Sequence, residues 1–173
     1  IASSANPTAT GSTNTIDLYA AIKLAFGTAI DPNSLENYAN QGKPVYITKS
    51  NTGANSITDK TATLGRVLFY DKNLSINNTI SCANCHQQQF AFGDTAIVSA
   101  GVEGGLTIRH SMRLINTRFA NEAKFFWNER AANLATQTTM PIVDHLEMGF
   151  SGTGGRGNFT TLTSKLSTIN YYK

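Results

Sequence analysis

The stretch Cys82-Ala83-Asn84-Cys85-His86 places two thiols three positions apart and an imidazole directly after the second thiol. Thiols at this spacing can form thioether bonds with the two vinyl groups on one edge of a porphyrin, and the adjacent imidazole can then bind the iron. The stretch therefore predicts covalent attachment of one c-type haem through Cys82 and Cys85, with His86 as an iron ligand.

Two other uses of a C-x-x-C pair are weaker interpretations. A zinc site needs two further ligands at similar spacing, but Cys82 and Cys85 are the only cysteines in the chain and no H-x-x-x-H pattern occurs. A redox dithiol normally follows a buried strand, and Thr79-Ile80-Ser81 is too short and too polar to be one.

A haem iron has a second axial position, for which the sequence offers several ligands. Methionine together with histidine is the usual pair in electron-transfer cytochromes. The residues alone do not rank the candidates, and an open position is a further alternative. The candidates are His110, His145, Met112, Met140 and Met148.

The composition limits the class of protein. The 173 residues are enough for one domain, or one domain with a tail, and 40% of them are apolar. The net charge of +3 is spread without a run of Lys or Arg, which argues against nucleic acid or an anionic membrane as a partner. No apolar stretch reaches the roughly eighteen residues of a transmembrane helix, and no signal-peptide pattern is visible at Ile1. Because bacterial c-type haem is attached outside the cytoplasm, we expect a periplasmic or otherwise extracytoplasmic protein whose signal peptide has been removed.

The elements that must position these groups are mainly helical. Residues 1–14 are rich in Ser, Thr, Ala and Asn and predict a flexible tether, so that residues 15–173 form the domain. Apolar residues at helical spacing predict helices near residues 16–26, from Asp59 as the capping residue, over 128–139 with an end before Pro141, and from Asn158. Residues 40–55, 87–110 and 149–157 are expected to be loops, the last of them mobile. No segment has a well-developed β pattern, so the predicted fold class is mainly α, a cytochrome c-like haem domain with long loops.

An ordered set of short motifs carries a resemblance to a known family. The motifs run from Leu64-Gly65-Arg66-Val67-Leu68-Phe69-Tyr70-Asp71 through Leu74-Ser75, the haem motif, Ala91-Phe92-Gly93-Asp94 and Arg109-His110-Ser111 to Phe125-Phe126-Trp127-Asn128-Glu129-Arg130-Ala131, Gln137, Pro141-Ile142 and Glu147-Met148-Gly149. Over about residues 60–150 the chain resembles the N-terminal haem domain of bacterial dihaem cytochrome c peroxidases. Related members of that family mature a tryptophan-derived quinone cofactor in methylamine dehydrogenase.

The resemblance implies a role for individual residues. His86 matches the proximal ligand of the peroxidatic haem, and Glu147 matches the distal acid. Gln137 and Pro141 match its neighbours over the distal face, and Trp127 matches the tryptophan between the two haems. A carboxylate over an open iron can move a proton between the two oxygens of a peroxide. Without the resemblance, Glu147 reads as a solvated loop carboxylate and Trp127 as part of a hydrophobic core.

Two positions depart from the family pattern. Many members carry a histidine sixteen residues after the proximal one, which caps the iron in the resting oxidised state and must leave for activity. Here that position is Val102, which has no donor atom, so we expect an open or water-bound sixth site. The position of His110 usually holds an asparagine that helps to bind calcium between the domains. Calcium prefers oxygen ligands, so this departure argues against the calcium ion.

The family also has a second C-x-x-C-H in a C-terminal domain, which is absent from this chain. The resemblance implies a haem c peroxidase domain that reduces hydrogen peroxide to water, with electrons from that partner haem or from a donor cytochrome or cupredoxin. Two alternatives are a monohaem electron-transfer cytochrome with a His or Met sixth ligand, and an oxidase of protein side chains. Whether the chain is a fragment or a monohaem relative stays open, as does a homodimer.

Overall fold

The computed structural model describes residues 17, 19–53, 55–120 and 124–173, so the predicted tether at residues 1–14 lies outside the described residues. Within the described residues the chain is helical and contains no strand, only three isolated β-bridges. The predicted mainly α fold is therefore confirmed. The α-helices are α1 (Ala20–Phe26), α2 (Asp59–Tyr70), α3 (Cys82–Cys85), α4 (Leu134–Val143) and α5 (Phe159–Ser167). Five short 3₁₀ helices join them: η1 (Lys72–Leu74), η2 (Gln88–Phe90), η3 (Val102–Gly104), η4 (Thr117–Phe119) and η5 (Asn170–Tyr172).

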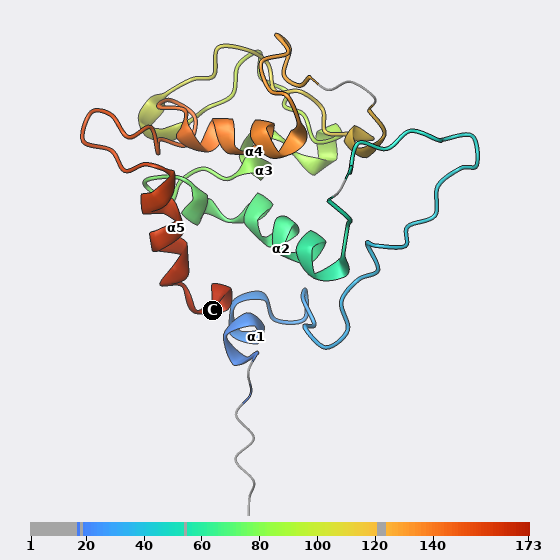
Figure 1. The fold of residues 1–173 in the computed structure, drawn as a ribbon. Helices are drawn as coiled ribbons and strands as arrows, with labels where there is room; N and C mark the ends of the chain where they lie inside the picture. Colours follow the sequence, from blue (N-terminus) through green and yellow to red (C-terminus); the bar gives the residue numbers. More distant parts are fainter. Residues whose placement is uncertain (1–16, 18, 54, 121–123) are drawn as a thin grey trace, which may run out of the picture.

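The helices are arranged around α2. Figure 1 shows α3 and α4 on one side of α2, α5 at one end of it, and α1 beside the C-terminus of the chain. The ring of Phe26 in α1 meets the ring of Tyr171 in η5 edge to face, with centroids 5.1 Å apart. The two ends of the described chain therefore pack together, away from α3 and α4.

The start of α2 differs from the prediction by one residue. Thr58, and not Asp59, is the capping residue. Its hydroxyl accepts the Thr61 N–H, and the Thr61 hydroxyl in turn accepts the Thr58 N–H. The Asp59 carboxylate instead accepts the N–H groups of Tyr38 and Ala39, at 2.7 and 2.8 Å. Asp59 thereby fixes the long segment before α2 to the helix.

The predicted end of a helix before Pro141 is wrong, because α4 runs through this residue to Val143. Its start also differs, since Asn133 caps the helix by accepting the Thr136 N–H at 2.8 Å. Proline removes one bond from the helix ladder. The tertiary structure outweighs that loss, because one more turn carries Ile142, which is 6% exposed, into the core.

The core is small and lies where α4, α5 and the segment after α4 meet. Its buried residues are Leu74, Ile142, Met148, Phe150 and Leu162. Helix α5 begins near Asn158 as predicted, and the Asn158 side chain caps it by accepting the Thr161 N–H at 3.1 Å. Loop 87–110 is less irregular than expected, because it contains η2, η3 and two of the β-bridges. Across the described residues, no helix has the length and apolar character needed to span a membrane.

Candidate haem pocket

A cavity of about 330 Å³ lies between α2, α3, α4 and the loops that follow α3. Most of the side chains that line it are apolar, among them Phe69, Ile80, Leu114 and Leu134. All seven residues predicted for the site from sequence and resemblance line this one cavity. They are Cys82, Cys85, His86, Trp127, Gln137, Pro141 and Glu147.

Helix α3 presents the two thiols to the cavity. It is a single turn, stabilised by the Asn84 side chain, which accepts the N–H and the hydroxyl of Ser81, both at 2.9 Å. Cys82 and Cys85 stand at i and i+3 of this turn and therefore share one face. They form no disulfide, and burial raises the pKa of both thiols. Two free thiols on one face of a turn fit thioether attachment.

The imidazole of His86 is oriented by the backbone. Its Nδ1 atom lies 2.9 Å from the carbonyl oxygen of Phe92. A carbonyl only accepts, so Nδ1 carries the proton and Nε2 keeps a lone pair for a metal. Ala91 and Phe92 both have φ of +57°, a conformation that L-residues adopt at a cost, and this double turn directs the Phe92 carbonyl back to His86.

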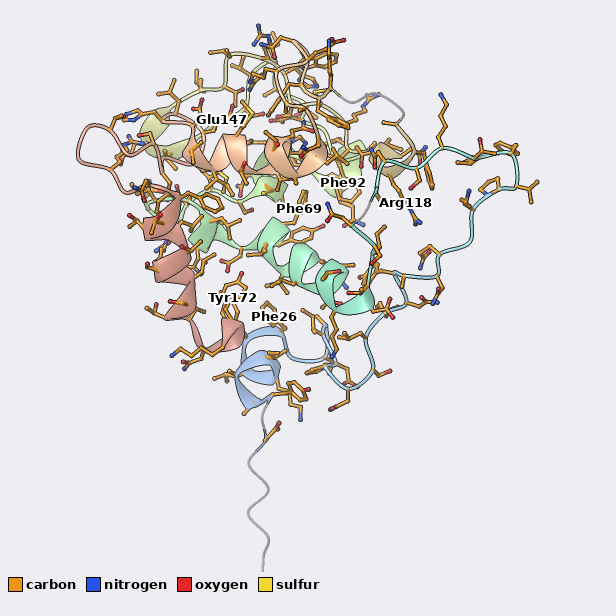
Figure 2. All side chains as sticks on the ribbon, in the orientation of Figure 1. Phe26, Phe69, Phe92, Arg118, Glu147 and Tyr172 are labelled. Atoms are coloured by element: carbon orange, nitrogen blue, oxygen red, sulfur yellow. The ribbon has the colours of Figure 1, made fainter. Side chains whose placement is uncertain are left out.

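The ring of Phe92 also contacts the ring of Phe69 from α2, with centroids 5.9 Å apart, and both are seen near the centre of Figure 2. The residues present therefore fit a c-type haem. An apolar cavity encloses two free thiols and a histidine whose second nitrogen is available.

One face of α4 forms a wall of the cavity. The lining residues of this helix are Leu134, Gln137, Thr138 and Pro141, which are spaced i, i+3, i+4 and i+7. Gln137 and Pro141 therefore lie on the same stripe, and the carbonyl that Pro141 leaves without a helical partner belongs to Gln137. The adjoining side of the helix carries Ile142 into the core, so α4 contributes to both the cavity wall and the core.

Glu147 is half-buried and follows α4. Burial raises the pKa of its carboxyl, and the negative charge of Asp144 raises it further, while the positive charge of Arg130 opposes both. The interpretation of Glu147 as a solvated loop carboxylate is therefore not supported. A half-buried carboxyl with a raised pKa at the wall of a cavity is suited to accepting and returning a proton.

Trp127 lies at the edge of the cavity and is 60% exposed, so the interpretation of it as a core residue is wrong. Of the five candidates for the sixth ligand, His110, Met112 and Met148 line the cavity, whereas His145 and Met140 do not. Val102 is 1% exposed and is not among the residues that line the cavity.

Two residues that shape the site were not identified from the sequence. Arg130 lines the cavity and acts on the charge of Glu147, and it also stacks on the Phe126 ring at 3.6 Å. Phe92 acts through its carbonyl, and no side-chain pattern reveals a backbone contact. Both residues stand in motifs that carry the resemblance, which was the only signal that marked them.

Comparison with known proteins agrees with this geometry. Residues 59–173 match a family model described as di-haem cytochrome c peroxidase. The chain is 28% identical to the methylamine utilization protein MauG of Methylophilus methylotrophus, over 69% of this chain and 33% of that protein. It is 36% identical to the cytochrome c peroxidase Ccp of Escherichia coli, over 49% of this chain and 18% of that protein. The chain thus spans about a third or less of these curated relatives.

Two solved structures have a similar fold. A MauG-like protein associated with microbial copper homeostasis superposes with a TM-score of 0.59 and 32% identity, covering 77% of this chain and 42% of that one. The dihaem peroxidase BthA of Burkholderia thailandensis gives a TM-score of 0.51 at 24% identity, covering 78% of this chain and 38% of that one. The second likeness concerns the fold alone.

Proposed function

Because the chain belongs to the di-haem cytochrome c peroxidase family, we propose that residues 15–173 form a peroxidatic haem c domain that reduces hydrogen peroxide to water. The observation that carries this proposal is the single cavity that holds the haem-attachment motif together with Glu147 and Gln137. An electron carrier needs the first of these features, but it has no use for a carboxyl whose pKa is raised by burial.

Each side chain of the site has its own role in the proposed reaction. The haem iron, when bound, supplies the site at which the oxygen–oxygen bond is reduced. Glu147 accepts a proton from the near oxygen of the peroxide and returns it to the far oxygen, which leaves as water. The Gln137 amide orients the peroxide by hydrogen bonds. Two electrons and two protons convert one peroxide to two waters, and Trp127 passes electrons from the partner haem.

The family also suggests the electron donor and the location of the protein. We propose that a second haem c domain, or a cytochrome or cupredoxin, donates the electrons, and that the protein works in the periplasm. Arg109 and Arg130 line the cavity and can pair with the carboxylates of the haem. The open sixth position is proposed because Val102 takes the place of the capping histidine.

The test is peroxide-driven oxidation of a reduced donor by the full-length, haem-loaded protein, wild type against Glu147→Gln. The substitution keeps the size of the side chain and removes the proton acceptor, so the rate should fall by on the order of a hundredfold. Equal rates would remove Glu147 from the mechanism.

An optical spectrum of the oxidised protein should show high-spin ferric haem.

A monohaem electron carrier is the second candidate, because Met112, Met148 and His110 line the same cavity and each could be a sixth ligand. A low-spin ferric spectrum together with no peroxide turnover would favour it. An oxidase of protein side chains is the third candidate, supported by the similarity to the methylamine utilization protein MauG. Turnover of peroxide with a small donor but not with a protein substrate would argue against this third function.

A further inference from the structure

The segment that carries Glu147 is anchored at its ends and exposed at its centre. Ile142 at the end of α4 is 6% exposed, and Met148 is 3% exposed, so both ends are fixed in the core. Between them, residues 143–146 are exposed. Core packing therefore does not by itself fix the backbone from which the Glu147 side chain extends.

A short loop, residues 101–105, contacts this exposed centre. The Val102 N–H points at the carbonyl oxygens of Leu146 and Glu147, both at 3.1 Å. A Cβ placed on Gly101 would lie 1.9 Å from the Leu146 carbonyl oxygen, and one on Gly105 would lie 2.7 Å from the same atom. Gly101 has φ of −111° and Gly105 has φ of −60°, values that other residues adopt freely. Close approach, and not backbone conformation, is therefore what requires glycine at both positions.

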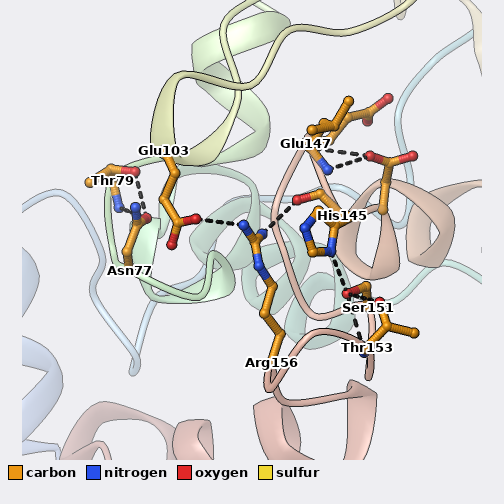
Figure 3. Close-up of polar contacts among 10 residues, drawn as sticks. Asn77, Thr79, Glu103, His145, Glu147, Ser151, Thr153 and Arg156 are labelled. Carbon is orange, nitrogen blue, oxygen red and sulfur yellow. Dashed lines mark hydrogen bonds and ion pairs between the residues drawn. The ribbon is translucent and has the colours of Figure 1, made fainter.

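Arg156 joins the same two segments from another side. One nitrogen of its guanidinium donates to the carbonyl oxygen of His145 at 2.6 Å, and the other pairs with the Glu103 carboxylate at 2.5 Å. Figure 3 shows this guanidinium between Glu103 and His145, with Glu147 on the adjoining turn. The Arg156 side chain is 15% exposed and the Glu103 side chain is 56% exposed, so the arginine end of the bridge is shielded from solvent and the carboxylate end is not.

Asp144 completes the arrangement from within the segment. Its carboxylate accepts the N–H groups of Leu146 and Glu147, at 2.8 and 3.0 Å, and its carbonyl accepts the Gly149 N–H at 2.8 Å. The Glu147 peptide is thus held on its N–H side by Asp144 and on its carbonyl side by Val102.

We propose that loop 101–105 and Arg156 act as a brace that positions Glu147 at the wall of the haem pocket, with Gly101 and Arg156 as positioning residues. This inference rests on the proposed peroxidase function of Glu147. It also assigns a role to the loop around Val102. The loop is a fixed support for the distal carboxyl, because Val102 is buried and its N–H is engaged by the segment that it supports.

The experiment uses the full-length, haem-loaded protein with Gly101→Ala and Arg156→Ala, each alone and combined with Glu147→Gln. Gly104→Ala is the matched control, since Gly104 stands in the same loop with nothing within 4 Å of an added Cβ and with φ of +79°. It therefore strains the loop without touching Leu146. We expect Gly101→Ala to lower peroxide turnover by on the order of a hundredfold, as a misplaced catalytic group does, and Arg156→Ala to lower it less.

The combined variants separate positioning from general damage. If the brace acts through Glu147, adding Gly101→Ala or Arg156→Ala to Glu147→Gln causes no further loss. The acid limb of the pH–rate profile should also move to lower pH in Gly101→Ala, because a displaced carboxyl is better solvated. A wild-type rate and profile in both single variants, or a full additional loss in the Glu147→Gln background, overturns the proposal. If Gly101→Ala does not fold, the Arg156→Ala pair decides on the same criteria.

A measurement without peroxide keeps this proposal apart from the proposed function. Amide hydrogen exchange across residues 144–149 should be faster in Gly101→Ala than in wild type or Gly104→Ala. If wild type and Glu147→Gln turn over equally, the acid–base role fails, and the exchange rates alone decide about the brace. Unchanged exchange in Gly101→Ala then overturns it.

Discussion

The indole N–H of Trp127 donates to the carbonyl oxygen of His110 at 2.9 Å, although the ring is 60% exposed. One hydrogen bond therefore fixes the orientation of a large aromatic side chain at the edge of the cavity. Tryptophan is enriched where one edge of a ring is anchored and the remainder meets a partner. This geometry suits a ring that passes electrons to the pocket from a second protein or domain.

Replacing Trp127 by Phe should slow peroxide turnover severalfold when electrons come from the partner haem. The substitution keeps an aromatic ring but removes the N–H that holds it against His110. Stopped-flow measurement of partner-haem oxidation checks this, with Tyr46→Phe as a control at an aromatic residue that is 80% exposed and does not line the cavity. An unchanged oxidation rate in Trp127→Phe would exclude the relay.

The two thiols of α3 should each carry a thioether bond to a single haem. Mass spectrometry of the denatured protein should then give the chain mass plus one haem for the part of the protein that holds residues 15–173. Cys82→Ala combined with Cys85→Ala should abolish that covalent increment, since no other cysteine is present. A denatured wild-type chain of unmodified mass would rule out the haem assignment.

The raised pKa of Glu147 predicts the direction of two pH effects. The carboxylate is the form that accepts a proton, so the acid limb of the rate profile should lie above the ordinary glutamate value of about 4.3. A raised pKa in the folded state means that stability falls as pH rises through that pKa, because the fold favours the protonated form. Glu147→Gln should therefore be at least as stable as wild type at pH 7 while it is far less active. Thermal unfolding of the haem-loaded proteins at pH 4 and pH 7 measures this, and a marked loss of stability at pH 7 would contradict it.

Asp71 predicts a pH effect of opposite sign. Burial acts to raise the pKa of its carboxyl, but hydrogen bonds from Asn73, Tyr172 and Tyr171 outweigh it and lower the pKa. A lowered pKa contributes stability that is present above the unfolded value of about 3.9 and is lost as pH falls through the folded value. Asp71→Asn should cost about 2 kcal/mol near pH 7, and the cost should shrink in acid. The free energy of unfolding in urea, measured near pH 7 and in acid, tests this, with the exposed Asp31→Asn as the control.

The sequence determined the local chemistry and several local structures. Two cysteines and a histidine within five residues are enough to predict haem attachment, because that reaction depends on neighbours along the chain. The start of helix α5 was predicted near Asn158, and it is a local feature, since the Asn158 side chain accepts an N–H three residues away. The class of fold followed for the same reason: helical periodicity is a property of residues that are close in sequence.

Contacts between distant segments were decided only by the tertiary structure. Helix α4 passes through Pro141 because the core gains Ile142, which a local rule does not weigh. The approach of Gly101 to Leu146 joins two loops and leaves no pattern in either. The raised pKa of Glu147 likewise depends on burial, which only the fold provides, and the fold also brings Arg130 close enough to oppose that shift. Without the family resemblance, the residues of this chain identify a haem site, but they do not identify the carboxyl beside it, because proximity across a cavity is a property of three dimensions.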